Sequence, residues 1–271
     1  MSQPLYALGD IHGQFDLLQD ALAQIEHDGG RDAAVVFIGD LTDRGTDSRK
    51  VIDLLIGEIT AGRNWTVIKG NHDRMFGWFM QDHPKMDPEL LLGMDWLEPR
   101  IGGRTTLASY GIKIDETSRY YQVHAAARAA VPAEHLAFLT ALPLYHETED
   151  YLFVHAGIRP NVALADQTEN DLVWMREPFL SHHVPHQKFV IHGHTALDAP
   201  QLYTNRLNLD GGAGLWSAAD PSADRRKSNV SAWARRPQPS CGASGLNQTY
   251  VRLLKINKLR PLHNSSFYEY P

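Results

Sequence analysis

Cysteine is nearly absent from this sequence, since Cys241 is the one cysteine among 271 residues. An internal disulfide needs two cysteines and a thiolate metal cage needs several, so both are excluded. Long apolar runs are missing too, and no stretch reaches the roughly 18 uninterrupted apolar residues of a membrane-spanning helix. The first residues show neither a basic segment nor a long apolar core. We therefore expect no secretory signal, no membrane partner and a cytoplasmic location.

Positive charge is also scarce overall, because 26 Lys and Arg stand against 32 Asp and Glu and give a formal net charge of −6. This balance is unlike that of a general nucleic-acid binder, so we expect no nucleic-acid partner. The charge is uneven, with nine Lys or Arg against three Asp or Glu in residues 217–271 and a net −12 in residues 1–216. Residues 217–249 are rich in Ala, Ser, Arg, Pro and Gly. This composition predicts a compact domain over residues 1–214 and an atypical tail over residues 215–271.

Short apolar runs alternate with helical patterns through the first domain, which is typical of an α/β sandwich with parallel strands. Helical stripes run from Phe15 to Ile25 and from Val51 to Ile59, and Pro132 begins a further helix. Residues 75–110 contain no clear strand and predict a helical cap-like insertion, with Trp78, Phe79 and Trp96 in its core rather than forming a base-stacking platform. The five predicted strands are Leu5–Leu8, Val35–Ile38, Thr66–Ile68, Leu152–Val154 and Phe189–Ile191.

A polar cluster follows each of these five strands. The clusters are Gly9-Asp10-Ile11-His12-Gly13, Gly39-Asp40-Leu41-Thr42-Asp43-Arg44-Gly45, Gly70-Asn71-His72-Asp73, His155-Ala156-Gly157 and His192-Gly193-His194-Thr195. Ligands of open α/β sheets bind at the carboxyl ends of the strands. We therefore expect all five clusters to converge on one site.

The side chains of these clusters favour hard-to-borderline divalent metals, because Asp, His and Asn supply oxygen and nitrogen ligands without sulfur. Asp10 and His12, two residues apart on extended backbone, would grip one ion. Asp40 has two carboxylate oxygens and would bridge two ions, while Asn71, His155 and His194 would supply neutral ligands for the second. The expected cofactors are thus two divalent ions, with manganese preferred over iron or zinc.

The ordered set of motifs resembles the phosphoprotein phosphatase family of calcineurin-like dinuclear metallophosphoesterases, over roughly residues 5–212. His155-Ala156-Gly157 and Gly70-Asn71-His72-Asp73 are most similar to its bacterial and phage serine/threonine phosphatase branch, which also contains symmetrical diadenosine tetraphosphate hydrolases. The resemblance implies a calcineurin-like β-sandwich flanked by helices, with the cap as an insertion.

The resemblance also implies a role for each motif residue. Asp10, His12 and Asp40 would bind the first metal, and Asp40, Asn71, His155 and His194 the second. Arg44 and Arg176 would clamp phosphate with Asn71 nearby, since guanidinium forks suit phosphate oxygens. His72 would be the general acid and Asp43 its orienting partner. His192 is the alternative to His194 as the ligand, but the matching histidine of the family precedes the threonine, so His192 is expected to pack beside the ligands. The role of Asp73 stays open.

These assignments predict a metal-dependent phosphomonoesterase acting on phosphoserine or phosphothreonine in proteins, or on small phosphate esters, by direct attack of a metal-bridging hydroxide. No Ser or Cys lies inside the clusters, so no phosphoenzyme is expected. The alternative substrate is diadenosine tetraphosphate, cleaved symmetrically. A catalytically silent metal-binding module is the alternative from another class. The oligomeric state stays open.

The reading frame suggests an origin for the tail. In bacterial members of the family that this sequence resembles, a sequence like Tyr-Gly-Arg-Pro-Leu-Thr tends to follow the position of Gly214. One codon choice for residues 215–220, TTA TGG TCG GCC GCT GAC, encodes Tyr-Gly-Arg-Pro-Leu when read one base later. We hypothesise that residues 215–271 come from a shifted frame or vector read-through, with an irregular middle and a substitute strand within Tyr250–Ile256.

Overall fold

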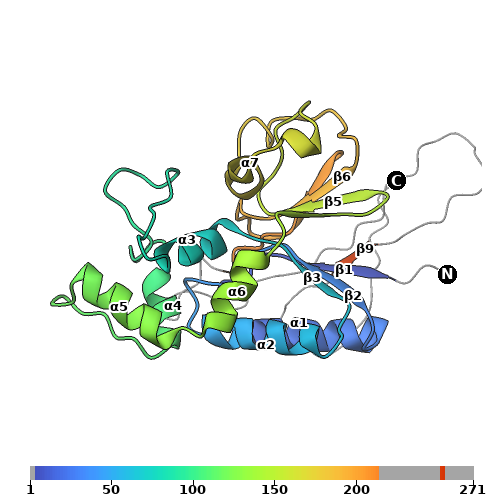
Figure 1. Cartoon of the computed structure of the whole chain (residues 1–271). Coiled ribbons are helices and arrows are strands. Elements are labelled where there is room, and N and C mark those ends of the chain that lie inside the picture. The colour runs from blue at the N-terminus through green and yellow to red at the C-terminus, as the bar shows by residue number, and fades with distance from the viewer. Residues whose placement is uncertain (1–3, 214–250, 254–271) are drawn as a thin grey trace, which may run out of the picture.

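The computed structural model describes residues 4–213 and the short segment 251–253. Two β-sheets face one another, with helices on their outer sides (Figure 1). The irregular middle predicted for the tail lies outside the described residues. Among the described residues, none of the helices combines the length and apolarity that a membrane crossing requires.

The first sheet is parallel throughout. Its strand order is β3 (Trp65–Val67), β2 (Ala34–Phe37), β1 (Leu5–Leu8) and β9 (Val251–Leu253). Leu5 pairs with Ala34 on one side and with Val251 on the other. A strand therefore forms within Tyr250–Ile256, as expected from its apolar residues.

The second sheet has a parallel centre, in which β5 and β8 flank β6, and antiparallel edges. Its strand order is β4 (Tyr145–Glu147), β5 (Tyr151–Val154), β6 (Phe189–His192), β8 (Arg206–Asn208) and β7 (Gln201–Leu202). All five predicted strands are present, and their ends shift by at most a residue. The predicted α/β sandwich is thus confirmed.

Alternation along β1 shows how the layers form. Tyr6 and Leu8 point into a core shared with the outer helices, whereas Ala7 points into the core between the sheets. Because both faces of the strand are covered, the apolar run is continuous rather than alternating with polar residues. Phe153 of β5 meets Ala7 in the central core, which holds the two sheets together.

Helices α1 (Phe15–Gly29) and α2 (Ser48–Thr60) lie under the first sheet, and α7 (Glu169–Trp174) lies on the outer side of the second (Figure 1). The apolar stripes predicted for α1 and α2 face the core, for example at the buried Leu18 of α1 and Leu55 of α2. The remaining helices are α3 (Asn71–Phe79), α4 (Gly103–Ser109), α5 (Tyr120–Ala130), α6 (Ala133–Ala141) and the 3-10 turn η1 (Leu164–Asp166).

The cap insertion predicted over residues 75–110 is helical at its two ends, in α3 and α4, but not in its middle. Residues 80–102 form turns and bends between α3 and α4, without a helix of their own. Pro84, Pro88 and Pro99 lack the amide hydrogen that a helix interior requires, which explains the irregular path. The core prediction holds for Phe79 and Trp96, which are 1% and 5% exposed.

Candidate metal centre and active site

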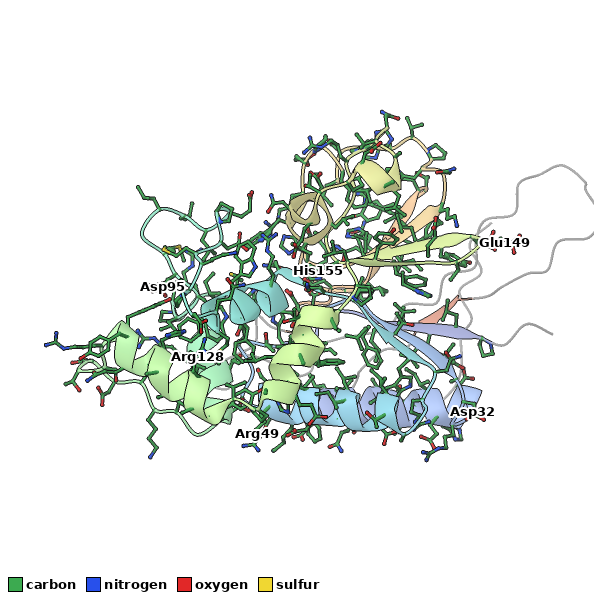
Figure 2. All side chains as sticks on the ribbon, viewed as in Figure 1. Asp32, Arg49, Asp95, Arg128, Glu149 and His155 are labelled. Atoms are coloured by element: carbon green, nitrogen blue, oxygen red, sulfur yellow. The ribbon has the colours of Figure 1, made fainter. Side chains whose placement is uncertain are left out.

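The loops that follow the five strands meet between the two sheets, and Figure 2 places His155 at this junction, at the end of β5. Each predicted metal ligand is less than one-tenth exposed. These buried residues are Asp10, His12, Asp40, Asn71, His155 and His194. The structure therefore brings together all six residues that the motifs indicated.

The first group of candidate ligands surrounds His12. Its Nε2 lies 3.5 Å from Oδ2 of Asp40 and 4.0 Å from Oδ2 of Asp10. Its Nδ1 is 2.9 Å from the carbonyl oxygen of Thr42, so Nδ1 carries the hydrogen and donates it. The lone pair of His12 Nε2 is consequently available to a metal ion.

The second group surrounds Asn71, whose Oδ1 lies 2.9 Å from His155 Nε2 and 3.0 Å from His194 Nδ1. His155 Nδ1 donates to the carbonyl oxygen of Ile38 at 2.8 Å, which leaves its Nε2 lone pair facing the group. Oδ1 of Asp40 is 3.3 Å from His155 Nε2. The two oxygens of Asp40 therefore face different groups, as expected for a bridging ligand.

The electrostatics of these groups fit divalent cations. Burial raises the pKa of Asp10 and of Asp40 well above the usual range, and repulsion from neighbouring carboxylates adds to it. Burial also lowers the pKa of His155 to about 4, so its imidazole is neutral near pH 7. Neutral imidazoles beside buried carboxylates are the donors that a divalent ion needs, and a cation offsets the carboxylate repulsion. The residues present therefore fit two such ions.

A second cluster lies beside the candidate ligands and contains the predicted acid. His72 Nδ1 is 2.7 Å from Oδ2 of Asp43, and both residues are buried. Arg44 places its Nη1 3.0 Å from His12 Nε2 and its Nη2 3.1 Å from His72 Nε2. The guanidinium thus lies at the edge of the first ligand group.

His72 also satisfies the geometry of a ligand, since it forms a potential metal-binding group with His12 and Asp40. Its Nε2 is 4.0 Å from Oδ2 of Asp40. Burial and the charge of Arg44 lower the pKa of His72, and burial raises the pKa of Asp43 to about 7. The assignment of His72 as acid therefore stays a prediction.

Arg176 follows α7 and is exposed, unlike the candidate ligands. Its positive charge contributes to lowering the pKa of His155 and of His194, after the larger effect of burial. Trp174, two residues earlier, packs edge-on against His194 with ring centroids 5.4 Å apart. The second predicted arginine is thus near the second ligand group, on the solvent side.

Left-handed backbone conformations gather at this site. Five of the six non-glycine residues with positive φ in the described chain are His12, Asp40, Asp43, Arg44 and His194. Such conformations are uncommon and costly for residues with a Cβ, so the surrounding loops must hold them in place. Two glycines make the close packing possible, because a Cβ on Gly70 would collide with Asp40 and one on Gly193 with Asp10.

The extended backbone expected between Asp10 and His12 is wrong. His12 has a φ of 47°, so Asp10 and His12 meet through a turn and not through strand alternation. Asn71 and His72 begin α3, where successive side chains diverge by the helical rotation. The backbone amide of His72 also donates to Oδ1 of Asp40 at 3.0 Å. Turns and a helix start, which the motif spacing does not reveal, therefore aim these side chains.

His192 and Asp73 both have structural environments. His192 is 5.0 Å from the ring of Phe179 and belongs to neither potential metal-binding group among the described residues. Asp73 accepts hydrogen bonds from the amides of Leu41 at 2.9 Å and Gly70 at 3.0 Å. It thereby ties the loop after β2 to the loop after β3.

Sequence reasoning did not assign to the site three buried residues that contact it. Trp96 Nε1 donates to Oδ2 of Asp43 and the Thr106 hydroxyl donates to Oδ1, each at 2.7 Å. Asp210, 4% exposed, contributes to raising the pKa of Asp10. The Asp210-Gly211-Gly212 sequence after β8 resembles the other strand-end clusters and offered a signal, whereas the cap residues offered none.

The site contains buried carboxylates and imidazoles beside an arginine fork, and it lies at the carboxyl edge of two facing sheets. This arrangement is that of a metal-dependent phosphoric ester hydrolase. The profile of the calcineurin-like phosphoesterase family matches residues 4–223. The chain belongs to this family, which confirms the predicted resemblance and enzyme class.

Several curated proteins resemble the chain at low identity. A bis(5'-nucleosyl)-tetraphosphatase PrpE (asymmetrical) of Anoxybacillus flavithermus is 24% identical over 231 residues, covering 76% of this chain and 84% of the relative. A protein of the same name from Halalkalibacterium halodurans is 25% identical over 231 residues, covering 76% and 83%. The crystal structure of a candidate diadenosine tetraphosphatase superimposes with a TM-score of 0.53 at 20% identity, covering 78% of this chain and 84% of that chain.

Proposed function

We propose that this protein is a phosphomonoesterase that hydrolyses phosphoserine, phosphothreonine or small phosphate esters by direct in-line attack of hydroxide on phosphorus. The contact of His72 Nδ1 with Asp43 at 2.7 Å carries this proposal. It directs Nε2 of His72 toward Arg44 and Asp40. An alkoxide leaving group needs a proton as the P–O bond breaks, and His72 would donate it from Nε2 of its doubly protonated ring, whose positive charge the Asp43 carboxylate would stabilise.

The arginines hold the substrate in this proposal. Arg44 is held between His12 and His72 and would turn its fork to phosphoryl oxygens when substrate enters. Arg176, exposed beside the second ligand group, would approach from the solvent side. Both charges offset the negative charge that spreads over the phosphoryl oxygens in the transition state.

Asp10, His12 and Asp40 would hold one divalent ion, and Asp40, Asn71, His155 and His194 would hold another. Two such ions supply hydroxide near neutral pH and neutralise phosphoryl oxygens. Asn71, between His155 and His194, would also orient the substrate. The preferred ions are manganese, with iron or zinc as alternatives.

The test combines metal control with a comparison of substrates. The chelated protein should not hydrolyse nitrophenyl phosphate, and manganese should restore hydrolysis of this ester and of a phosphoserine peptide. Matched chelation and refilling of Asp53→Asn, a surface carboxylate variant, controls for the handling. Turnover by fully metal-free protein would overturn the proposal, as would a manganese-loaded protein that cleaves no phosphomonoester.

Hydrolysis of diadenosine tetraphosphate is the second candidate, favoured by the names of the relatives described above. The motif resemblance favours symmetrical cleavage, whereas those names specify the asymmetrical reaction. Symmetrical cleavage gives two ADP, and asymmetrical cleavage gives ATP and AMP. Chromatography of the products, with rates measured beside those on the phosphopeptide, distinguishes the substrate and the position of attack.

A further inference from the structure

We infer that Trp96 and Thr106 of the cap insertion are positioning residues that hold the Asp43 carboxylate for His72. This inference rests on the proposed phosphomonoesterase function, in which His72 is the acid. The cap would then orient the carboxylate that supports the acid, in addition to packing against the domain.

The contacts at Asp43 divide between its two oxygens. Oδ2 accepts from His72 Nδ1 and from Trp96 Nε1, both at 2.7 Å. Oδ1 accepts from the hydroxyl of Thr106, also at 2.7 Å. Donors on both oxygens fix the plane of the carboxylate, so Oδ2 stays aimed at the imidazole.

Thr106 is itself held in one orientation. Its Oγ1 accepts from the backbone amide of Asp43 at 2.8 Å, while its hydrogen goes to Oδ1. The hydroxyl of Ser48 lies 3.1 Å away and donates to Oγ1, since the Thr106 hydrogen is already used. Thr106 is 0% exposed, so water does not compete for these contacts.

Trp96 is held by aromatic packing. Its ring stacks on Phe76 with centroids 5.0 Å apart and a 13° angle between planes, and it also contacts Phe79 at 4.7 Å. Phe76 and Phe79 lie on α3, the helix that begins at Asn71 and His72. The element that carries the imidazole therefore also anchors the indole.

The cap approaches the Asp43–Arg44 turn closely enough to require glycine. Gly102 has a φ of 100°, and a Cβ there would collide with the backbone nitrogen of Arg44. A Cβ on Gly103 would collide with the Trp96 ring. Asp43 and Arg44 have φ values of 73° and 65°, so the cap packs against a turn that needs external support.

The test uses substitutions that keep shape and remove the donor, namely Trp96→Phe and Thr106→Val. With His72 as acid, each should lower kcat for an alkyl phosphate by about 10- to 100-fold. The loss on nitrophenyl phosphate should be much smaller, and KM and bound metal should be unchanged. Thr106→Ser keeps the hydroxyl and should retain kcat.

Tyr110→Phe is the matched control, because it removes one buried hydrogen bond of the same region, from Tyr110 to His135 at 2.8 Å, away from Asp43. Thermal unfolding of each variant shows whether it folds. Folded, metal-loaded variants that keep full alkyl phosphatase activity would overturn the inference. Equal losses on both esters would overturn it too, by indicating a general structural role.

An activity-independent readout separates this inference from the proposed function. In zinc-loaded protein labelled with 15N-histidine, the His72 ring signals should shift in Trp96→Phe and Thr106→Val but not in Tyr110→Phe. An unchanged His72 signal in the first two variants would overturn the inference. If the wild-type protein cleaves no phosphomonoester, the proposed function fails, while the shifts still decide whether Trp96 and Thr106 hold the pair.

Discussion

The imidazole of His72 lies 2.7 Å from the carboxylate of Asp43, although 29 residues separate them in the sequence. Asp43 belongs to the loop after β2, and His72 is the second residue of α3, which follows β3. Because β2 and β3 are parallel neighbours, their carboxyl ends present both residues at one edge. The pair is thus a product of sheet topology.

Removal of this imidazole should affect substrates according to their leaving groups. His72→Ala should lower the rate on an alkyl phosphate by about 10²–10⁴-fold, because an alkoxide needs a proton to depart. Nitrophenolate departs without one, so nitrophenyl phosphate should suffer far less. Asp43→Asn should show a weaker version of this pattern. The measurements are the rates on both esters and the bound metal, taken in parallel. Equal losses of rate on both esters, together with depleted metal, would reassign His72 as a ligand.

Asp40→Asn should abolish the dinuclear site, because the two oxygens of Asp40 face His12 and His155 separately. The amide keeps the size of the side chain but removes the charge that would bridge the two ions. Manganese should restore activity to the chelated wild-type protein and not to this variant. Metal analysis and nitrophenyl phosphatase rates are the measurements, with Asp53→Asn as the control, and normal metal content in Asp40→Asn would contradict the bridging role.

Arg176→Ala should weaken phosphate binding and transition-state stabilisation. Loss of a charged hydrogen bond of about 1.5–3 kcal/mol corresponds to about a 10- to 100-fold fall in kcat/KM. Arg159→Ala is a matched control near α7, because Arg159 pairs with Asp171 instead. Steady-state kinetics and inhibition by inorganic phosphate test the effect. If the two arginine variants behave alike, Arg176 has no special part in binding.

Metal binding should change how the stability of the protein depends on pH. Burial raises the pKa of Asp10 and Asp40 above the usual 3.8, so their stabilising contribution is present below that value and is lost as pH rises through the raised pKa. The pKa of His155 is lowered from 6.5 to about 4, so its effect on stability has the opposite pH dependence. Its stabilising contribution is present above pH 6.5 and is lost as pH falls through about 4.

Manganese should bind the ionised carboxylates and offset their repulsion, so it should raise Tm more at pH 8 than at pH 6. Thermal unfolding at both values, with manganese or chelator, measures this. Asp40→Asn should lose most of the difference. A manganese-induced shift that is larger at pH 6 would contradict the assignment of the buried carboxylates as ligands.

Truncation after residue 216 tests the tail. All proposed site residues precede this point, so activity should persist, while loss of β9 beside β1 should lower Tm. Loss of activity in a truncated protein that still folds would argue for a functional tail. The proposed frame shift has its own direct test, since the nucleotide sequence of the gene should encode Tyr-Gly-Arg-Pro-Leu one base out of register near residue 215.

The sequence alone determined the strands and the chemistry of their ends. Buried parallel strands such as β1 are short apolar runs, and the polar residues after them interrupt the pattern sharply, so both are visible without coordinates. The same signals identified Asp40 and His155 as members of one site, because parallel strands present their carboxyl ends together. The cap's path was less predictable, since residues 80–102 form turns and bends without helix or strand periodicity, and the contact of Trp96 with Asp43 exists only in the folded chain.

The orientation of the site residues and the contacts that support them depend on the packing of distant segments. The left-handed turns at His12 and Asp43 depend on contacts from other loops, which no local pattern specifies. Trp96 and Thr106 reach Asp43 across 53 and 63 residues, and their local sequence indicates an aromatic core residue and a helical threonine. Because a hydrogen bond depends on distance and direction in space, its partners become apparent only when the cap is packed against the sheet edge.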